Sequence, residues 1–334
     1  MNSFFGADIA GTYIGSARLL HRDGRLAKPL APVASSAKFR QRKENVVRFA
    51  AIDKATADPA IRSAKGPVAI IIAEDDVEID TTIRHHRFAG FRTIILVAPP
   101  EVELGKDVAE LVIRVDHPTR MHDATEVVVN AIAAALPEKT WLYYCYNAEF
   151  LFYPYAESRT VGEMLIFHGE ERRSAMLTYV IDVYAGDLRD ANDAVSLEDA
   201  HLDRSGYYGQ ARYGEDGQNK DRQLDFHGGL RWRFEEHIAD ARRRIDRIAI
   251  VRTQKGVRLR ADHTWSDEEF NTFACPWHNN VTAAIVSFRT AKALRTNPAS
   301  RFDIDTFRWH NSTEFEWHSQ QLLELGLMEP GQWF

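Results

Sequence analysis

The chain has 334 residues, of which 45% are hydrophobic and 27% are charged. These fractions are typical of globular proteins and exclude a disordered, collagen-like or disulfide-scaffold chain. The 42 lysines and arginines against 48 aspartates and glutamates give a net charge of −6, which argues against nucleic acid as a partner. The two cysteines, Cys145 and Cys275, are too few for a disulfide framework and favour a reducing compartment.

No segment of the sequence has the pattern of a leader or a membrane anchor. The first residues, MNSFFGADIAGTYIG, lack the basic flank and long apolar run of a signal peptide. The longest apolar runs, such as residues 68–73, are far shorter than the ~20 residues that a membrane helix needs. We therefore expect a cytoplasmic protein with no transmembrane segment.

The first half of the chain has the pattern of an α/β fold. Residues 41–63 have helical spacing. Short apolar runs then predict strands at residues 68–73, 92–97, 111–115 and 141–146, with helices at 76–89 and from Asp123 to Pro137. This order, with its short connections, favours a mostly parallel, Rossmann-like sheet flanked by helices.

The second half has a more mixed pattern. Thr160 and Glu163 form a capping-box pattern at the start of a helix. Residues 186–226 are rich in Gly, Asp and Arg and predict a long loop region. Strands are expected at 175–185, 247–252 and 257–261, and helices at 278–295 and 313–325. Ser266 and Glu269 have the pattern of another helix cap.

Polar residues follow three of the four strands in the first half. They are Glu74 and Asp75 after the first strand, Asp116 and His117 after the third, and Asn147 and Glu149 after the fourth. Ligands of a parallel sheet bind at the C-terminal ends of its strands. These acidic and amide groups can therefore hold a nucleotide base, a ribose hydroxyl or a metal. The alternative for Asp75 is that it caps the next helix.

Four segments of the sequence together resemble one protein family. They are IIIAEDDVEIDTTIRHHRFAGFRTIILV, WLYYCYNAEFLFYPY, HGGLRWRF and RADHTW. The first has Glu74-Asp75 in place of an Asn-Glu pair, then His85-His86 and Gly90. With the Glu-Phe-Leu and Gly-Gly-x-Arg motifs, the segments resemble family 2-like bacterial glycosyltransferases with the A-type nucleotide-sugar fold.

The resemblance implies an architecture and an activity. It implies an N-terminal extension at 1–66, a nucleotide-sugar-binding α/β half at 67–155 and a C-terminal α+β acceptor half at 156–334. Because no Gly/Ser-rich linker separates the two halves, we expect one continuous body. The implied reaction moves a sugar from a nucleotide-diphosphate donor, of UDP type, to a surface polysaccharide or glycolipid. The implied donor-binding residues are Glu74, Asp75, Asn147, Glu149, Gly228, Gly229, Arg231 and Arg233.

The sequence departs from the family at the metal site. Family members hold a divalent cation, Mn²⁺ or Mg²⁺, with an Asp-x-Asp motif. The two aspartates align with Tyr146 and Ala148 here, and neither is a carboxylate. Three alternatives follow. Glu149 and His263 can complete a reduced metal site, arginines can neutralise the diphosphate instead, or the chain is an inactive relative that only binds.

The segment after residue 224 supplies candidates for phosphate binding and proton transfer. Gly228 and Gly229 allow close approach of the backbone, and Arg231 and Arg233 suit phosphate oxygens. The alternative is a solvated basic face. The candidates for the base that activates an acceptor hydroxyl are Asp225 and His227, with Asp225 first because it lies just before the two glycines, and Asp182 in the expected strand at 175–185.

Overall fold

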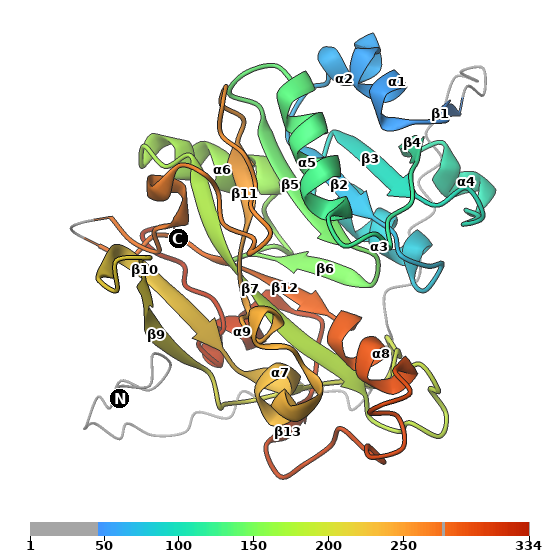
Figure 1. Ribbon diagram of the computed structural model, residues 1–334, viewed down its shortest axis with the longest axis vertical. Helices are drawn as coiled ribbons and strands as arrows, with labels where there is room; N and C mark the ends of the chain where they lie inside the picture. The colour runs from blue at the N-terminus through green and yellow to red at the C-terminus, as the bar shows by residue number, and fades with distance from the viewer. Residues whose placement is uncertain (1–45, 276–277, 334) are drawn as a thin grey trace, which may run out of the picture.

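The computed structural model describes residues 46–275 and 278–333. Five parallel strands, in the order β1-β4-β3-β2-β5, form one half of a large sheet (Figure 1). They are β1 (Val47–Phe49), β2 (Val68–Ile72), β3 (Thr93–Ala98), β4 (Ile113–Asp116) and β5 (Trp141–Tyr146). Every residue of β2 is buried, as its unbroken apolar sequence requires of a strand covered on both faces.

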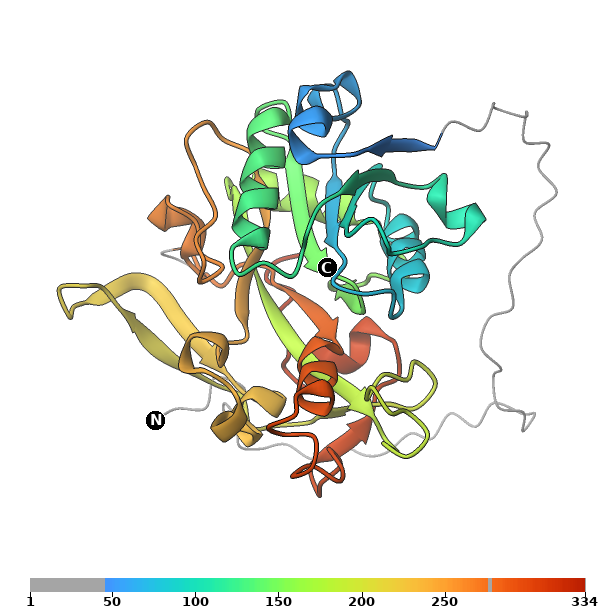
Figure 2. The same cartoon turned by 45° about the vertical axis from the view of Figure 1, so that its right-hand side comes forward.

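Helices cover both faces of these parallel strands. The chain runs outward from β2 to β3 through α3 (Ile79–Phe88), and it returns from β4 to β5 through α5 (Ala124–Ala135). Right-handed crossovers in opposite directions place their helices on opposite faces, and Figure 2 shows α3 and α5 on the two sides of the strands. The short helices α1 (Ile52–Ala57) and α2 (Pro59–Arg62) pack near α5, and α4 (Lys106–Ala109) packs near α3.

The sheet continues beyond β5 with strands of both directions. The order β5-β11-β7-β12-β6 adds β6 (Glu149–Phe152), β7 (Ala175–Ala185), β11 (Asp246–Arg252) and β12 (Ala283–Ser287). β11 is antiparallel to both of its neighbours, whereas β7 and β12 are parallel to each other. β7 and β12 therefore run in the same direction as β5, and their C-terminal ends lie at the same edge of the sheet.

The remaining elements lie around this extension. β8 (Ala200–Asp203) pairs with β7 and β13 (Ser312–Glu314), while β9 (Tyr208–Tyr213) and β10 (Asn219–His227) form a separate hairpin. The helices are α6 (Val161–Glu170), α7 (Gly229–Arg233), α8 (Arg289–Thr296) and α9 (Ser319–Glu324). The 3-10 helices are η1 (Glu235–His237), η2 (Asp240–Arg242) and η3 (Glu268–Asn271). Figure 1 shows α7 and α8 side by side, in agreement with their contacts.

The coarse fold prediction is confirmed. The structure is an α/β protein in which a large mixed sheet, with parallel core strands, is flanked by helices. The apolar runs at 141–146 and 175–185 are β5 and β7 with the predicted bounds. The capping box is also present, because the Thr160 side chain accepts from the Glu163 amide and the Glu163 side chain accepts from the Thr160 amide.

Several predicted elements are wrong. The expected helix at 278–295 is the strand β12 followed by α8, and that at 313–325 is β13 followed by α9. The expected loop at 186–226 contains β8, β9 and most of β10. The expected helix at 41–63 is broken by β1 before α1, and its first five residues lie outside the described part. At 257–261 the structure has an isolated bridge in place of a strand.

Candidate functional site

The centre of the site is the point where the strand order reverses, between β2 and β5. Asn147, directly after β5, is buried there and joins the two strand ends. Its Oδ1 accepts from the Glu74 amide at 3.0 Å, and its Nδ2 donates to the Asp75 carboxylate at 2.6 Å and to the Val77 carbonyl at 2.9 Å. Such a reversal point is where open α/β sheets bind ligands. The polar residues predicted at the ends of the first and fourth strands are thus in direct contact.

The two carboxylates after β2 are each paired with a cation from α8. Glu74 accepts from Arg289 Nε at 2.8 Å and Nη2 at 2.7 Å, and Asp75 accepts from Lys292 Nζ at 2.9 and 2.7 Å. Burial alone would raise the pKa of both carboxyls, but the paired cations lower each below its ordinary value. α8 begins two residues after β12, so the strand order brings these cations to the same edge of the sheet.

Glu149 is a fully buried carboxylate in an ion pair with Arg247 of β11. Arg247 donates from Nη1 to Oε2 at 2.6 Å and from Nη2 to Oε1 at 3.0 Å. The Ser287 hydroxyl donates to Oε1 at 3.0 Å, and the Tyr146 amide donates to Oε2 at 2.9 Å. Desolvation raises the pKa of Glu149, but Arg247 and these donors bring it down to about 2. Each oxygen therefore accepts two hydrogen bonds.

His263 lies beside this ion pair and is surrounded by positive charge. Its Nδ1 is 3.0 Å from the Tyr144 hydroxyl, and the two rings stack at 6.0 Å between centroids. Burial lowers the pKa of His263 well below its ordinary value, and the charges of Arg247, Arg289 and Arg231 lower it further. The imidazole is therefore neutral, and three arginines converge on this part of the site.

An open pocket adjoins Glu74 at the C-terminal ends of β3 and β4. Its volume is about 450 Å³, within the range of small-molecule sites. Its lining residues are Ala50, Pro99, Pro100, Glu101, Asp116, His117, Pro118, Thr119, Arg120 and Met121. Arg120 connects it to the reversal point, because its Nε donates to the Glu74 carbonyl at 2.8 Å. The pocket thus contains Asp116 and His117, which were singled out from the sequence.

The three predicted bases have different surroundings. The Asp182 side chain is completely buried, its carboxylate accepts from Arg231 Nε and from the Arg231 amide, each at 3.3 Å, and burial raises its pKa. Asp225 accepts from two arginines, Arg212 Nε at 2.7 Å and Arg244 Nη1 at 2.9 Å.

His227, at the end of β10, has no ion pair among the described residues. Its ring stacks on Tyr208 with 5.3 Å between centroids. It is half-buried, and burial lowers its pKa.

The glycine–arginine segment has its two arginines in separate places. Gly228 and Gly229 have left-handed backbones, at φ 152° and 61°, and a side chain at Gly228 would collide with the Tyr207 ring. Arg231 contacts Asp182 and donates from Nη1 to the Arg244 carbonyl at 2.6 Å. Arg233 instead contacts Asp203 and lies 4.5 Å from the centroid of the Trp309 ring.

Four cations of the site, Arg120, Arg247, Arg289 and Lys292, were missed in the sequence. The last two were missed because residues 283–287 were interpreted as part of a helix. The unbroken apolar run AAIV at residues 283–286 was the available signal. Interpreted as a strand, it would have placed Arg289 and Lys292 just beyond a strand end, where ligands bind. Arg247 lies inside a strand, and its sequence carries no comparable signal.

The residues expected to hold a metal do not form a cluster. Among the residues that the structure describes, no three His, Cys, Asp or Glu side chains are grouped as a metal site. Both oxygens of Glu149 are occupied as described above, and His263 contacts Tyr144.

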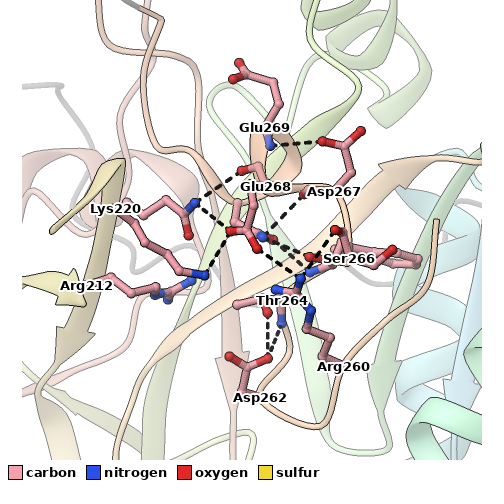
Figure 3. Close-up of polar contacts among 12 residues, drawn as sticks. Arg212, Lys220, Arg260, Asp262, Thr264, Ser266, Asp267, Glu268 and Glu269 are labelled. Atoms are coloured by element: carbon pink, nitrogen blue, oxygen red, sulfur yellow. Dashed lines mark hydrogen bonds and ion pairs between the residues drawn. The ribbon is translucent and has the colours of Figure 1, made fainter. Parts of the chain in front are cut away.

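A second pocket, of about 400 Å³, lies between β10 and η3. Lys220 Nζ donates to Glu268 Oε2 at 3.0 Å, and Arg260 Nη2 donates to Glu268 Oε1 at 2.9 Å. Figure 3 shows Lys220 and Arg260 reaching Glu268 from different segments. Beside it, Glu269 is paired with Arg222 and Arg173. These charges pair with one another. The ion pairs between β10 and η3 hold the β9–β10 hairpin against the rest of the protein.

Comparisons with known proteins give no assignment. No protein-family model matches the chain, and no curated protein matches it. Within residues 46–275 and 278–333, no helix has the length and apolar character needed to cross a membrane.

Proposed function

We propose that this protein is a glycosyltransferase that uses a nucleotide-diphosphate sugar as donor. The observation that supports it best is the open pocket of about 450 Å³ at the C-terminal ends of β3 and β4, which Arg120 connects to Glu74 at the reversal point of the sheet. A pocket in this place suits a nucleoside, since open α/β sheets bind nucleotides outside the C-terminal ends of their strands. The resemblance of the four sequence segments to family 2-like glycosyltransferases supports the same reaction.

The proposed donor lies with its base and ribose in the pocket. Pro99, Pro100 and Met121 offer apolar surface to the base, beside Asp116, whose carboxylate is held by Arg48 and Arg114. The diphosphate then points toward Glu74 and the cations of α8. In this arrangement Asn147, Glu74 and Asp75 fix the shape of the strand ends and position those cations, rather than binding the donor through free oxygens.

For the acceptor base, the surroundings favour His227 over the two aspartates. Asp182 is buried beneath Gly229, where an acceptor hydroxyl has no access, and Asp225 is already held by two arginines. The lowered pKa of His227 keeps its imidazole neutral at pH 7, able to take a proton. The acceptor hydroxyl would lose its proton to His227 as its oxygen bonds to the anomeric carbon. The bond from that carbon to the diphosphate breaks, and its electron pair leaves with the diphosphate.

One observation favours a second candidate, a binding protein without catalysis. The residue aligned with the acidic end of the family motif, Glu149, has both oxygens filled by protein donors. Release of the sugar from a bound donor, with or without an acceptor, distinguishes the transferase from this alternative.

Calorimetric titration with UDP, and then with GDP, tests the proposed pocket. Ala50 is exposed and lines the pocket, so Ala50→Trp should fill it and weaken binding by about tenfold or more. Ala57, at the end of α1, is exposed and is not among the lining residues, so Ala57→Trp is the matched control. If neither nucleotide binds, or if both variants behave alike, the donor-site proposal is wrong.

A further inference from the structure

The proposed function raises the question of what neutralises the donor diphosphate. In the family that the sequence resembles, a divalent cation does so. A hard cation requires several oxygen ligands with free lone pairs. Each oxygen of Glu149 accepts two hydrogen bonds, and the Asn147 oxygen accepts from the Glu74 amide within a buried contact. The residues at this position therefore do not fit a divalent cation.

Two arginines with free nitrogens lie next to each other at this place, both held by Glu74. Arg289 uses Nε and Nη2 for the Glu74 carboxylate, and Arg120 uses Nε for the Glu74 carbonyl. Within the described part of the chain, Nη1 of Arg289 and both terminal nitrogens of Arg120 have no hydrogen-bond partner. The Arg289 side chain is 32% exposed, and Arg120 is exposed and lines the pocket. Both can therefore donate to a ligand.

The position of Arg289 is fixed before any ligand binds. Its guanidinium lies 3.9 Å from the centroid of the Tyr146 ring, while two of its nitrogens are held by one carboxylate. A guanidinium held in this way loses little freedom on binding, and its planar fork matches two phosphate oxygens. Arg289 is therefore better suited to bind a diphosphate than an arginine whose guanidinium moves freely in water.

The local charge favours an anion. Around Glu74 the four cations Arg120, Arg247, Arg289 and Lys292 face the three carboxylates Glu74, Asp75 and Glu149. Arg231 and Asp182 form a further, balanced pair. Of these four cations, Arg120 is the one without a carboxylate partner among the described residues, and it lines the pocket at the side where the diphosphate would lie.

We infer that Arg120 and Arg289 bind the donor diphosphate in the place of a divalent cation, so that nucleotide binding is independent of metal. This inference rests on the proposed function, because it takes the 450 Å³ pocket as the nucleoside site. It assigns to two residues outside the sequence motifs the charge that the Asp-x-Asp site provides in the family.

The test is calorimetry on the full-length protein with UDP and with uridine, in EDTA and then in Mn²⁺. UDP should bind in EDTA with an affinity that Mn²⁺ changes by less than about twofold. Arg289→Gln and Arg120→Gln should each weaken UDP by about tenfold, the scale of a lost charged hydrogen bond, and leave uridine unchanged. Arg120 is exposed and its side chain makes one hydrogen bond in the described part of the chain. Arg120→Gln should therefore leave the protein folded, so that a loss of UDP affinity reports on ligand binding.

Arg92→Gln is the matched control, because Arg92 is exposed just before β3, at the opposite edge of the sheet. The inference is overturned, and the pocket assignment stands, if Mn²⁺ strengthens UDP binding tenfold or more. The same holds if Arg289→Gln and Arg120→Gln bind UDP as tightly as the wild type does. If neither uridine nor UDP binds under any condition, the proposed function fails together with the inference.

Discussion

Glu149 and Arg247 illustrate how a buried charge is kept in this protein. Both side chains are almost inaccessible, at 0% and 3% exposure. Taking two charges out of water is costly, and the pair is retained because four hydrogen bonds satisfy the carboxylate. Arg247 Nε remains buried with no hydrogen-bond partner in the described part of the chain. The guanidinium also lies over the Tyr146 ring, 5.2 Å from its centroid.

Removing one charge of this pair should destabilise the fold strongly. We expect Glu149→Gln to lower the free energy of unfolding by about 3–5 kcal/mol, since it leaves Arg247 buried and uncompensated. The double variant with Arg247→Met should recover part of the loss. Urea unfolding measures both, with Glu103→Gln at an exposed position as control. Equal stability of Glu149→Gln and the control would contradict the assigned ion pair.

The same residue should contribute to acid sensitivity. The folded-state pKa of Glu149 is about 2, against an ordinary value of 4.5. A lowered pKa stabilises the folded state fully above pH 4.5, and this contribution disappears as the pH falls toward 2. The stability difference between the wild type and Glu149→Gln should therefore narrow over that interval. Unfolding curves at several pH values check this, and a constant difference would refute it.

His227 is the proposed base for the acceptor hydroxyl. His227→Gln should lower kcat by a factor on the order of 10² to 10⁴ and leave the donor KM unchanged, because a general base acts after the donor is bound. The pH profile of kcat should lose its acid limb in the variant. Steady-state kinetics with a transferring acceptor measures both. A variant that loses only donor affinity would assign His227 to binding instead.

Among the helices and strands, the sequence predicted best those that are buried and have a clear apolar pattern. β5 and β7 were predicted with correct bounds because long apolar runs between polar turns have few alternatives. Residues 283–286 form a four-residue apolar run whose periodicity does not separate strand from helix. Pairing with β7 and β6, which lie more than a hundred residues earlier, decides that they form a strand.

The β9–β10 hairpin shows why polar strands escape sequence prediction. Most β10 residues are exposed or half-buried, and a register shift between Asn219 and Leu224 disturbs the alternation. A strand of this kind lacks the period-two apolar pattern on which prediction depends. Its position is set instead by charged contacts such as those of Glu268 and Glu269 with Lys220, Arg222 and Arg260.

Breaking the ion pairs of Glu268 should increase local opening of the β9–β10 hairpin. We expect Glu268→Gln to speed amide hydrogen exchange in β10 several-fold while the global unfolding temperature changes little, because the ion pairs that it breaks are partly exposed. Glu215→Gln, at the exposed turn of the same hairpin, is the matched control. Hydrogen-exchange mass spectrometry measures the difference. Equal exchange rates of the β10 amides in the two variants would contradict the role of Glu268 in holding the hairpin.

At the scale of the whole molecule, the sequence predicted one side of the site and missed the other. Glu74, Asp75 and Asn147 follow strands that could be recognised, and parallel strands bring their ends together. The cations that pair with Glu74 and Asp75 come from α8, whose position depends on the strand order of the second half. That order inserts the antiparallel β11 between β5 and β7, which no local pattern specifies.

The shared sheet also predicts how the molecule unfolds. Strands from both sides of residue 155 are paired, β5 with β11 and β6 with β12. We therefore expect one cooperative transition when circular dichroism and tryptophan fluorescence are followed together. A fragment of residues 67–155 should fail to fold alone, because β5 and β6 lose the partners that cover their edges. Two separate transitions, or a folded fragment, would show independent halves.

The distance along the chain between Glu74 and Arg289 has a consequence for synthesis. The two residues are 215 positions apart. At roughly 5–20 residues per second, Arg289 emerges from the ribosome on the order of 10–40 s after Glu74. Until then the carboxylate of Glu74, at the end of β2, faces water without its cation. The nascent chain can form the first parallel strands early, but the charged centre of the molecule closes only after Arg289 and Lys292 have been synthesised.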